Sequence, residues 1–284
     1  MGCAAFGAPF EKEITMSSHS SKGTALITGA STGIGAVYAD RLAKRGYDLI
    51  LVARSQEKLS EVAKQIQSAT GRKVETLPAD LTVPADVHRV ADRLATDSSI
   101  TALVNNAGIA AANKLLESDP NYLDQMIQLN VTALTRLALA AAPRFVARAN
   151  GLIINIGSIV ALAPELLNGT YSGTKAYVQN FSTSLKNELA GKGVTVQVVL
   201  PGATATPMWD KAGLPIHNLP TEWVMTTEDM VDASLAGLDQ GEFATIPALP
   251  NAADFEAYEK ARIALAPNLS RKNPADRYGI GARQ

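Results

Sequence analysis

A glycine-rich stretch near the N-terminus constrains most strongly what this chain can fold into. It follows a short apolar run, residues 25–27, and apolar residues recur at helical spacing after it. The stretch reads Thr28-Gly29-Ala30-Ser31-Thr32-Gly33-Ile34-Gly35. A helix N-terminus exposes unpaired N–H groups, and glycine lets the backbone approach an anion closely. The pattern predicts a strand, a phosphate-binding turn and a helix; the alternative is a tight turn without a ligand.

Length and charge limit the possible classes of function. The chain has 284 residues, 46% of them apolar, and a formal net charge of −1, which suits one large α/β domain. This balance gives no electrostatic reason to expect a nucleic acid or a membrane surface as partner. No apolar run reaches the roughly 20 residues that span a bilayer. The lone cysteine, Cys3, fits a reducing cytoplasm, and the scattered His19, His88 and His217 predict no metal site.

The first 22 residues differ in composition from the rest of the chain. They are small and polar, with several serines close together. They lack a basic segment followed by an apolar core, which a secretory signal requires. We therefore expect residues 1–22 to be a flexible N-terminal extension.

From residue 23 onward, apolar runs of strand length alternate with helical patterns. The predicted strands are residues 25–27, 48–52, 74–77, 102–105, 152–156, 194–200 and 244–246. The predicted helices are residues 35–45, 56–69, 85–96, 122–148, 171–190 and 228–238. Repeated βα units imply a parallel sheet with helices on both faces, and the strands are apolar enough for such a sheet. We predict a single doubly wound α/β domain, residues 23–284, with about seven parallel strands.

Polar residues and glycines gather where the predicted strands end. They are Arg54, Asp80, Leu81, Asn106, Ser158, Gly202, Thr204 and Thr206. In a doubly wound sheet, ligands bind beyond the carboxyl ends of the strands, near the point where the strand order reverses. We therefore expect these residues and the glycine-rich turn to form one site.

A tyrosine and a lysine open the long helical pattern at residues 171–190. Tyr171 and Lys175 are four residues apart, so they share one helix face. A lysine ammonium beside a phenol favours the phenolate and lowers the pKa of the tyrosine from its usual value near 10. Such a tyrosine can transfer a proton at neutral pH. The spacing alone recurs by chance on many helices, but here it accompanies Ser158 and the glycine-rich turn.

Together these motifs resemble the short-chain dehydrogenase/reductase family. The matching residues, in order, are Thr28 to Gly35, Asp80-Leu81, Asn105 to Gly108, Asn130, Ser158, Tyr171 with Lys175, and Pro201-Gly202 with Thr206. The order and spacing are typical of the family over nearly the whole predicted domain. The resemblance implies a Rossmann-type fold and a nicotinamide-dependent oxidoreductase that interconverts a carbonyl and an alcohol.

The resemblance also implies roles for individual catalytic residues. Tyr171 would be the general acid/base, and Lys175 would lower its pKa and hold the nicotinamide ribose. Ser158 would hydrogen-bond the substrate oxygen. Asn130 would position a water between Lys175 and solvent; alternatively, it could cap or kink its helix.

Other residues are implied to bind the cofactor. Asp80 and Leu81 would contact the adenine, and Asn106 would line the adenosine side. Thr204 and Thr206 would hold the carboxamide, beside Gly202. The alternatives are structural: Asp80 could cap a helix, and Asn106 could tie two strand ends together.

Arg54 predicts the choice of cofactor. An acidic residue at the end of the second strand would bind the ribose hydroxyls of NAD, but residues 52–55 contain none. A guanidinium there suits the 2′-phosphate of NADP. We expect NADP(H) in preference to NAD(H), with a solvated arginine at a strand end as the alternative.

Residues 208–225 follow the sixth strand, where the family has a mobile substrate lid. They carry many large apolar side chains, which predicts a lid over a mainly apolar ketone, aldehyde or secondary alcohol. Ordinary core packing is the alternative. The small residues of the helices at 122–148 and 171–190 predict a homodimer or homotetramer. A different class of function, a non-catalytic dinucleotide sensor on the same fold, stays open.

Overall fold

One parallel sheet of seven strands forms the centre of the molecule. The computed structural model describes residues 22–280, so residues 1–21, which hold nearly all of the expected extension together with Cys3 and His19, lie outside the described residues. The strand order is β3-β2-β1-β4-β5-β6-β7, and each neighbouring pair is parallel. The strands are β1 Thr24–Thr28, β2 Asp48–Ala53, β3 Val74–Pro78, β4 Ile100–Asn105, β5 Gly151–Ile156, β6 Val194–Val199 and β7 Ala244–Thr245. All seven predicted strands are confirmed, with small differences at their ends.

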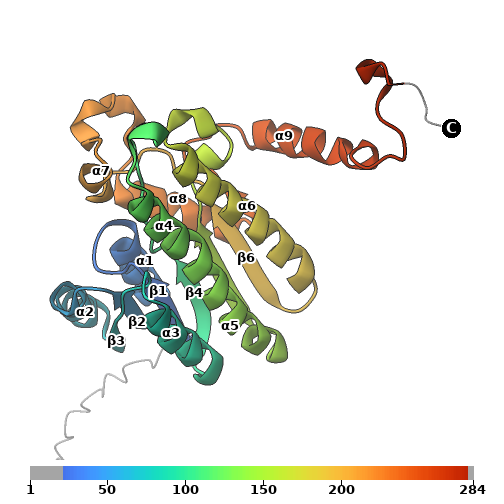
Figure 1. Cartoon of the computed structure of the whole chain (residues 1–284). Coiled ribbons are helices and arrows are strands. Elements are labelled where there is room, and N and C mark those ends of the chain that lie inside the picture. The colour runs from blue at the N-terminus through green and yellow to red at the C-terminus, as the bar shows by residue number, and fades with distance from the viewer. Residues whose placement is uncertain (1–21, 281–284) are drawn as a thin grey trace, which may run out of the picture.

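Helices cover both faces of this sheet (Figure 1). Helices α1, α2 and α8 pack on one face, and α3, α5 and α6 pack on the other. The larger helices are α1 Gly33–Lys44, α2 Gln56–Thr70, α3 Pro84–Thr96, α4 Pro120–Ile127, α5 Leu134–Ala147, α6 Gly169–Leu189, α8 Thr227–Asp239 and α9 Ala252–Ala264. The doubly wound α/β fold predicted from the alternating pattern is therefore confirmed.

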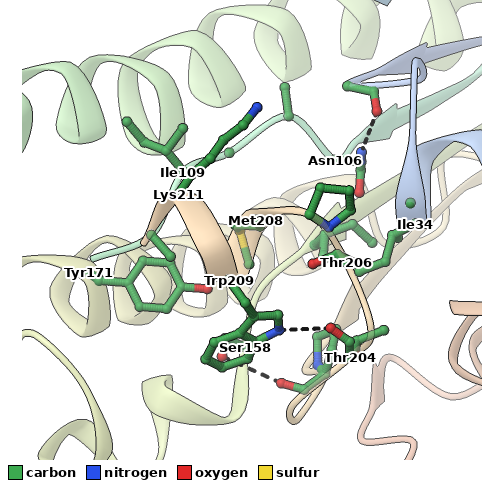
Figure 2. Close-up of a pocket in the computed structure, with 18 of the residues that line it drawn as sticks. Ile34, Asn106, Ile109, Ser158, Tyr171, Thr204, Thr206, Met208, Trp209 and Lys211 are labelled. Carbon is green, nitrogen blue, oxygen red and sulfur yellow. Dashed lines mark hydrogen bonds between the residues drawn. The ribbon is translucent and has the colours of Figure 1, made fainter. Parts of the chain in front are cut away.

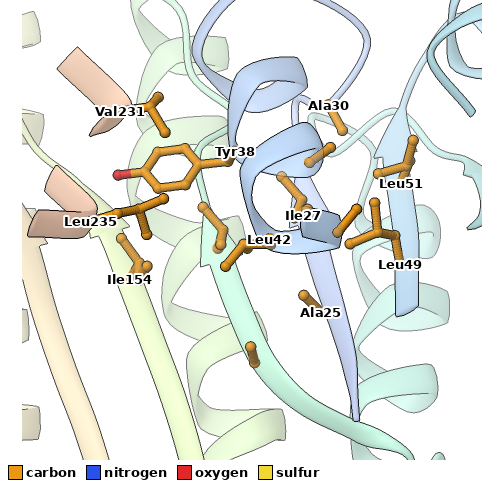
Figure 3. Close-up of a cluster of buried hydrophobic side chains, with 14 of the residues drawn as sticks. Ala25, Ile27, Ala30, Tyr38, Leu42, Leu49, Leu51, Ile154, Val231 and Leu235 are labelled. Carbon is orange, nitrogen blue, oxygen red and sulfur yellow. The ribbon is translucent and has the colours of Figure 1, made fainter. Parts of the chain in front are cut away.

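The strands place alternate side chains on opposite faces of the sheet. Ile27 of β1, Leu42 of α1 and Leu235 of α8 belong to one buried cluster, in which Leu235 lies beside Tyr38 and Ile154 (Figure 3). Tyr38 is fully buried in this layer, and its hydroxyl donates a hydrogen bond to Ser234 Oγ at 2.6 Å. Each buried aliphatic side chain contributes about 1.5–3 kcal/mol to the free energy of unfolding. This packing fixes the strand ends at which the site is built.

The helical stretch predicted at residues 122–148 is confirmed, but it is not α-helical throughout. The structure has α4, then a π-helical segment, Gln128–Ala133, then α5. Asn130 lies in the π-helical segment and is buried. Its amide donates to Ile109 O at 2.9 Å and accepts from Ile109 N at 3.0 Å. A π-helical turn inserts an extra residue, and here it accompanies an asparagine that holds a neighbouring loop.

Helix α9 was missed by sequence analysis. Asn251 caps it by accepting a hydrogen bond from Ala253 N, and short 3₁₀ turns follow at Ala266–Asn268 and Asp276–Tyr278. Figure 1 shows α9 projecting away from the rest of the molecule. A helix that leaves no residue buried gives no core-facing stripe from which to predict it.

Candidate active site

A large cleft crosses the carboxyl ends of the strands, where the order reverses between β1 and β4. Its volume is about 1710 Å³. Fifteen of the predicted site residues line it: Gly29, Ser31, Thr32, Gly33, Ile34, Arg54, Asp80, Leu81, Asn106, Ser158, Tyr171, Lys175, Gly202, Thr204 and Thr206. Gly35 and Asn130 are buried and do not line the cleft. The fold therefore brings together residues that are up to 177 positions apart, from Gly29 to Thr206.

The glycine-rich turn opens helix α1 onto the cleft. Gly33 has a φ of +57°, a conformation that favours glycine. A Cβ atom on Gly35 would collide with the carbonyl oxygen of Gly29 and with the amide of Asn106. The Thr32 side chain does not cap α1, and the first turn contains no acidic residue. The first N–H groups of α1 therefore suit an anion in the cleft.

Asn106 ties two strand ends together, which was the structural alternative to cofactor binding. Its Nδ2 donates to Thr28 O at 2.9 Å and to Gly29 O at 3.2 Å, and Figure 2 shows one such bond. The side chain thereby ties the end of β4 to the end of β1. It also lines the cleft, so this tie fixes the wall of the site.

Two basic side chains lie beside β2 at one end of the cleft. Arg54 follows the strand, and Lys58 lies in the first turn of α2; both are exposed and line the cleft. Burial alone would raise the pKa of Asp80, but hydrogen bonds from Thr82 and the nearby Arg54 guanidinium hold this pKa below its usual value. Sequence analysis missed Lys58, although its position one turn after Arg54 was a usable signal.

Ser158, Tyr171 and Lys175 form a buried cluster in the middle of the cleft. Their side chains come from the end of β5 and from the first turns of α6, with exposed fractions of 9%, 5% and 7%. Lys175 Nζ lies 5.8 Å from the centre of the Tyr171 ring and donates to Ile156 O at 2.9 Å. Figure 2 shows the Tyr171 ring directed toward the lid residues and Ser158. The predicted catalytic residues therefore adjoin one another.

The predicted direction of the tyrosine pKa shift is wrong for this structure. Burial raises the pKa of Tyr171 to about 12, and a hydrogen bond with Ser158 opposes this rise without reversing it. Burial also lowers the pKa of Lys175, to about 8, and its ammonium donates a hydrogen bond to Ile156 O at 2.9 Å. Desolvation acts on both groups and disfavours both charged forms.

Asn130 supports the cluster from behind. Besides its bonds to Ile109, its Nδ2 donates to Thr174 Oγ1 at 3.1 Å. Thr174 belongs to α6 and lies next to Lys175 in the sequence. Asn130 lies in the π-helical segment, so it also has a local structural role of the kind that was the alternative for it. Asn130 therefore joins the loop after β4 to the start of α6.

A lid covers the cleft opposite Tyr171. Residues 208–225 contain α7, Met208–Lys211, and two 3₁₀ turns. The stem of the lid is closed by backbone hydrogen bonds between Ala203, Ala205 and Met225. Trp209 Nε1 donates to Thr204 O at 2.8 Å (Figure 2). The lid residues that line the cleft are mostly apolar: Met208, Trp209, Lys211, Leu214, Leu219, Glu222, Trp223, Val224 and Met225.

Thr206 leaves a polar atom available in the cleft. Its Oγ1 is buried and has no hydrogen-bond partner in the structure. A buried hydroxyl without a partner costs free energy, so it points to a ligand with a polar group at this place. Within residues 22–280, no group of three or more metal-binding side chains occurs, and no helix is long and apolar enough to cross a bilayer.

A comparison with known protein families identifies the chain. Residues 23–215 match the model of the short chain dehydrogenase family. Because this match covers well over half of the chain, the protein belongs to the short-chain dehydrogenase/reductase family of oxidoreductases. The resemblance stated from the sequence motifs is therefore confirmed.

Several solved structures and curated proteins are similar to this chain. A short-chain dehydrogenase from Sphingobium yanoikuyae in complex with NADPH is 46% identical, with a TM-score of 0.87 and coverage of 90% of this chain and 99% of that chain. The bulky-bulky ketone specific alcohol dehydrogenase from Comamonas testosteroni is 41% identical, with a TM-score of 0.83 and coverage of 90% and 98%. Very-long-chain 3-oxoacyl-CoA reductase-A of Danio rerio is 37% identical over 201 residues, 69% of this chain. The match spans only 62% of that reductase.

Proposed function

We propose that this protein is an NADP(H)-dependent oxidoreductase that interconverts a mainly apolar ketone or aldehyde and the corresponding alcohol. The observation that carries the proposal is the buried cluster of Ser158, Tyr171 and Lys175, which faces one cleft together with the glycine-rich turn. A tyrosine that can donate a proton beside a hydroxyl that can hold an oxygen suits carbonyl reduction. Family membership supports the same class of reaction.

The residues present fit a nicotinamide dinucleotide phosphate. The N-terminus of α1 would hold the pyrophosphate, because the first N–H groups of a helix bind anions. The turn before the helix requires glycine at residue 35, where a Cβ would collide with Gly29 O. Arg54 and Lys58 would hold the 2′-phosphate, and the unpartnered Thr206 hydroxyl would bond the carboxamide. The 46% identical structure that holds NADPH supports this choice. When bound, the cofactor supplies or accepts the hydride.

The chain's own residues then manage the oxygen and the proton. The Ser158 hydroxyl donates a hydrogen bond to the carbonyl oxygen, on which negative charge develops. Tyr171 donates its proton to that oxygen. Its pKa of about 12 keeps it protonated at neutral pH, and an alkoxide is a much stronger base than a phenolate. In alcohol oxidation, Tyr171 starts as the phenolate, which a charged Lys175 stabilises, and takes the proton from the alcohol to become the neutral phenol.

The lid supports a large apolar substrate. Met208, Trp209, Leu214, Ile109 and Val160 line the cleft together with Tyr171, and Met208, Ile109 and Val160 pack in one cluster with it. Such walls exclude water and favour apolar groups. The Comamonas testosteroni enzyme, named for bulky ketones, supports this substrate class. The similarity to 3-oxoacyl-CoA reductases makes a long-chain 3-oxoacyl thioester the second substrate to test.

We also infer a cytoplasmic homo-oligomer. Exposed apolar side chains on α5 and α6, Leu139 and Tyr177, share a surface across which Thr135 Oγ1 and Tyr177 OH lie 2.8 Å apart. This surface supports pairing through these helices. The lone Cys3 supports a reducing compartment.

One substrate panel tests the proposed function. Aldehydes, bulky and small ketones, a 3-oxoacyl thioester and a charged keto acid are each offered with NADPH and with NADH, and nicotinamide absorbance is followed. We expect the highest kcat/KM with NADPH and a bulky apolar ketone. Preference for the small keto acid would contradict the substrate class. If no substrate of the panel is turned over while NADPH binds, the protein is the dinucleotide sensor instead.

A further inference from the structure

The C-terminal arm, residues 250–280, is a formed segment that its own chain leaves uncovered. Every residue of the arm is exposed except Phe255 and Glu259, which are half-buried. Helix α9 buries no residue, and its main contact among the described elements is the 3₁₀ turn that follows it. Figure 1 shows that the helix extends away from the sheet and its covering helices. The arm is therefore not stabilised by the core.

This exposure is costly for a segment of its composition. Tyr258, Ile263, Leu265 and Leu269 have exposed fractions of 46%, 59%, 57% and 75%. A helix as short as α9 is marginal in water, since isolated helices below about 12–15 residues hardly form. Clustered exposed apolar groups mark interaction surfaces. The arm therefore has the properties of a segment that packs on another molecule.

The body of the protein exposes a second apolar surface, which we call the rim patch: Leu115, Leu116 and Leu166. Leu116 is 99% exposed and Leu166 is 54% exposed. The two segments that carry them are joined, because Asn168 Nδ2 donates to the backbone carbonyl of residue 113 at 2.9 Å and to the hydroxyl of residue 118 at 3.0 Å. Leu166 also lines the cleft. The rim patch is thus a rigid apolar edge of the cleft mouth.

Charges beside the two surfaces have opposite signs. Glu117, Asp119 and Glu165 flank the rim patch, with Lys114 as the nearby base, and all four are exposed. Beyond Leu269, the arm carries three exposed basic residues, Arg271, Lys272 and Arg277, against one acidic residue, Asp276. Helix α9 itself carries three acidic residues and two basic ones, so it is the basic end of the arm, beyond Leu269, that matches the acidic groups at the rim.

We propose that the arm of one molecule docks on the rim patch of a second copy, and that the exchange is reciprocal. An arm that points away from its own body meets a rim patch only on another molecule. Exchange of identical segments closes a two-fold dimer without leaving a free arm. The docked arm covers the mouth of the substrate cleft beside Leu166. A membrane suits the arm less well, because its charges are mixed and α9 is only weakly amphipathic.

The matches to two solved structures reach into the arm. The structures at 46% and 41% identity each match 90% of this chain, about 256 residues. Residues 1–249 number 249, so both matches include some residues of the arm.

Hydrogen exchange of the full-length protein tests the proposal. Exchange of the α9 amides is measured at protein concentrations where light scattering gives the dimer mass and where it gives the monomer mass. We expect exchange about tenfold slower or more in the dimer. Leu116→Asp, a fully exposed change on the body, should abolish this protection in α9. Leu265→Asp on the arm should do the same, whereas the matched control Lys260→Gln on the same helix should preserve it.

Three results would overturn the proposal. Rapid exchange of the α9 amides in a sample with the dimer mass would show that the arm does not dock on the second copy. Slow exchange that persists in the monomer, or that survives Leu116→Asp, would place the arm elsewhere. Slow exchange seen only with phospholipid vesicles would make it a membrane-binding segment.

Discussion

Burial of the Lys175 side chain beside Tyr171 makes folding less favourable as long as the amine is charged. Burial lowers the pKa of Lys175 to about 8 from its usual 10.5. Between these values the unfolded chain binds more protons than the folded chain, so this group makes folding more favourable as the pH rises. Below pH 8 both states are protonated, and the cost of burying the charge is fully present. A shift of this size corresponds to about 3 kcal/mol.

Replacement of this lysine by methionine removes the buried charge. We predict that the stability of Lys175→Met relative to wild type is greatest near pH 7 and declines by up to about 3 kcal/mol by pH 10.5. The variant also loses the hydrogen bond to Ile156 O, and this loss changes the stability difference by the same amount at every pH. Urea unfolding of both proteins at pH 7, 8.5 and 10 measures the trend. A difference that is constant with pH would contradict the assigned burial of charge.

We propose that Arg54 and Lys58, which line the cleft beside β2, determine the choice of cofactor. We predict that Arg54→Asp weakens NADPH binding about 10- to 100-fold, since a hydrogen bond to a charged group contributes about 1.5–3 kcal/mol, and that NADH binding changes much less. Lys58→Ala should weaken NADPH binding in the same direction. Lys64→Ala, a lysine of the same helix that does not line the cleft, is the matched control. Equal losses for both cofactors would remove Arg54 and Lys58 from this role.

Individual residues show what sequence can and cannot reveal. Tyr171 and Lys175 were found because a helix puts residues four apart on one face, and Ser158 because parallel strands end at one edge. The direction of the Tyr171 pKa shift was missed, because it depends on how completely the lid and neighbouring loops exclude water. Sequence spacing carries no measure of that burial.

At the scale of elements, the lid is fastened to the loop that carries Thr204 and Thr206. Trp209 donates to Thr204 O, and Trp209→Phe removes this donor while keeping an aromatic ring. We predict that kcat/KM falls about 2- to 10-fold, as expected for one hydrogen bond of about 0.5–1.5 kcal/mol. Steady-state kinetics with a bulky ketone measures the change. An unchanged kcat/KM in Trp209→Phe would show that this bond does not hold the lid in place.

The elements divide into those that periodicity reveals and those that it does not. The seven strands and most helices were predicted because each buries a face, so that apolar residues recur with the period of the element. The π-helical segment at Gln128–Ala133 was missed, because one inserted residue barely disturbs a helical pattern. Helix α9 was missed because it buries no face, so its apolar residues show no helical period.

At the scale of the whole molecule, the fold places hydride chemistry at one point. The reversal of strand order between β1 and β4 opens a cleft, the glycine-rich turn faces one part of it, and Ser158 with Tyr171 faces another. Lid residues and Leu166 of the rim patch line further parts of it. If this is correct, the Tyr171 hydroxyl acts on the substrate, and the cleft forms without it.

Kinetics of Tyr171→Phe tests this central claim most directly. The substitution keeps the buried ring and removes only the hydroxyl, so we predict a folded protein that binds NADPH with unchanged affinity. Positioned acid–base catalysis typically contributes about 10²–10⁴ in rate, and kcat for the best substrate of the panel should fall by a factor in that range. NADPH titration of the same preparation is the control for folding. A kcat within a few-fold of wild type would contradict the account, because Tyr171 could not then be the proton donor.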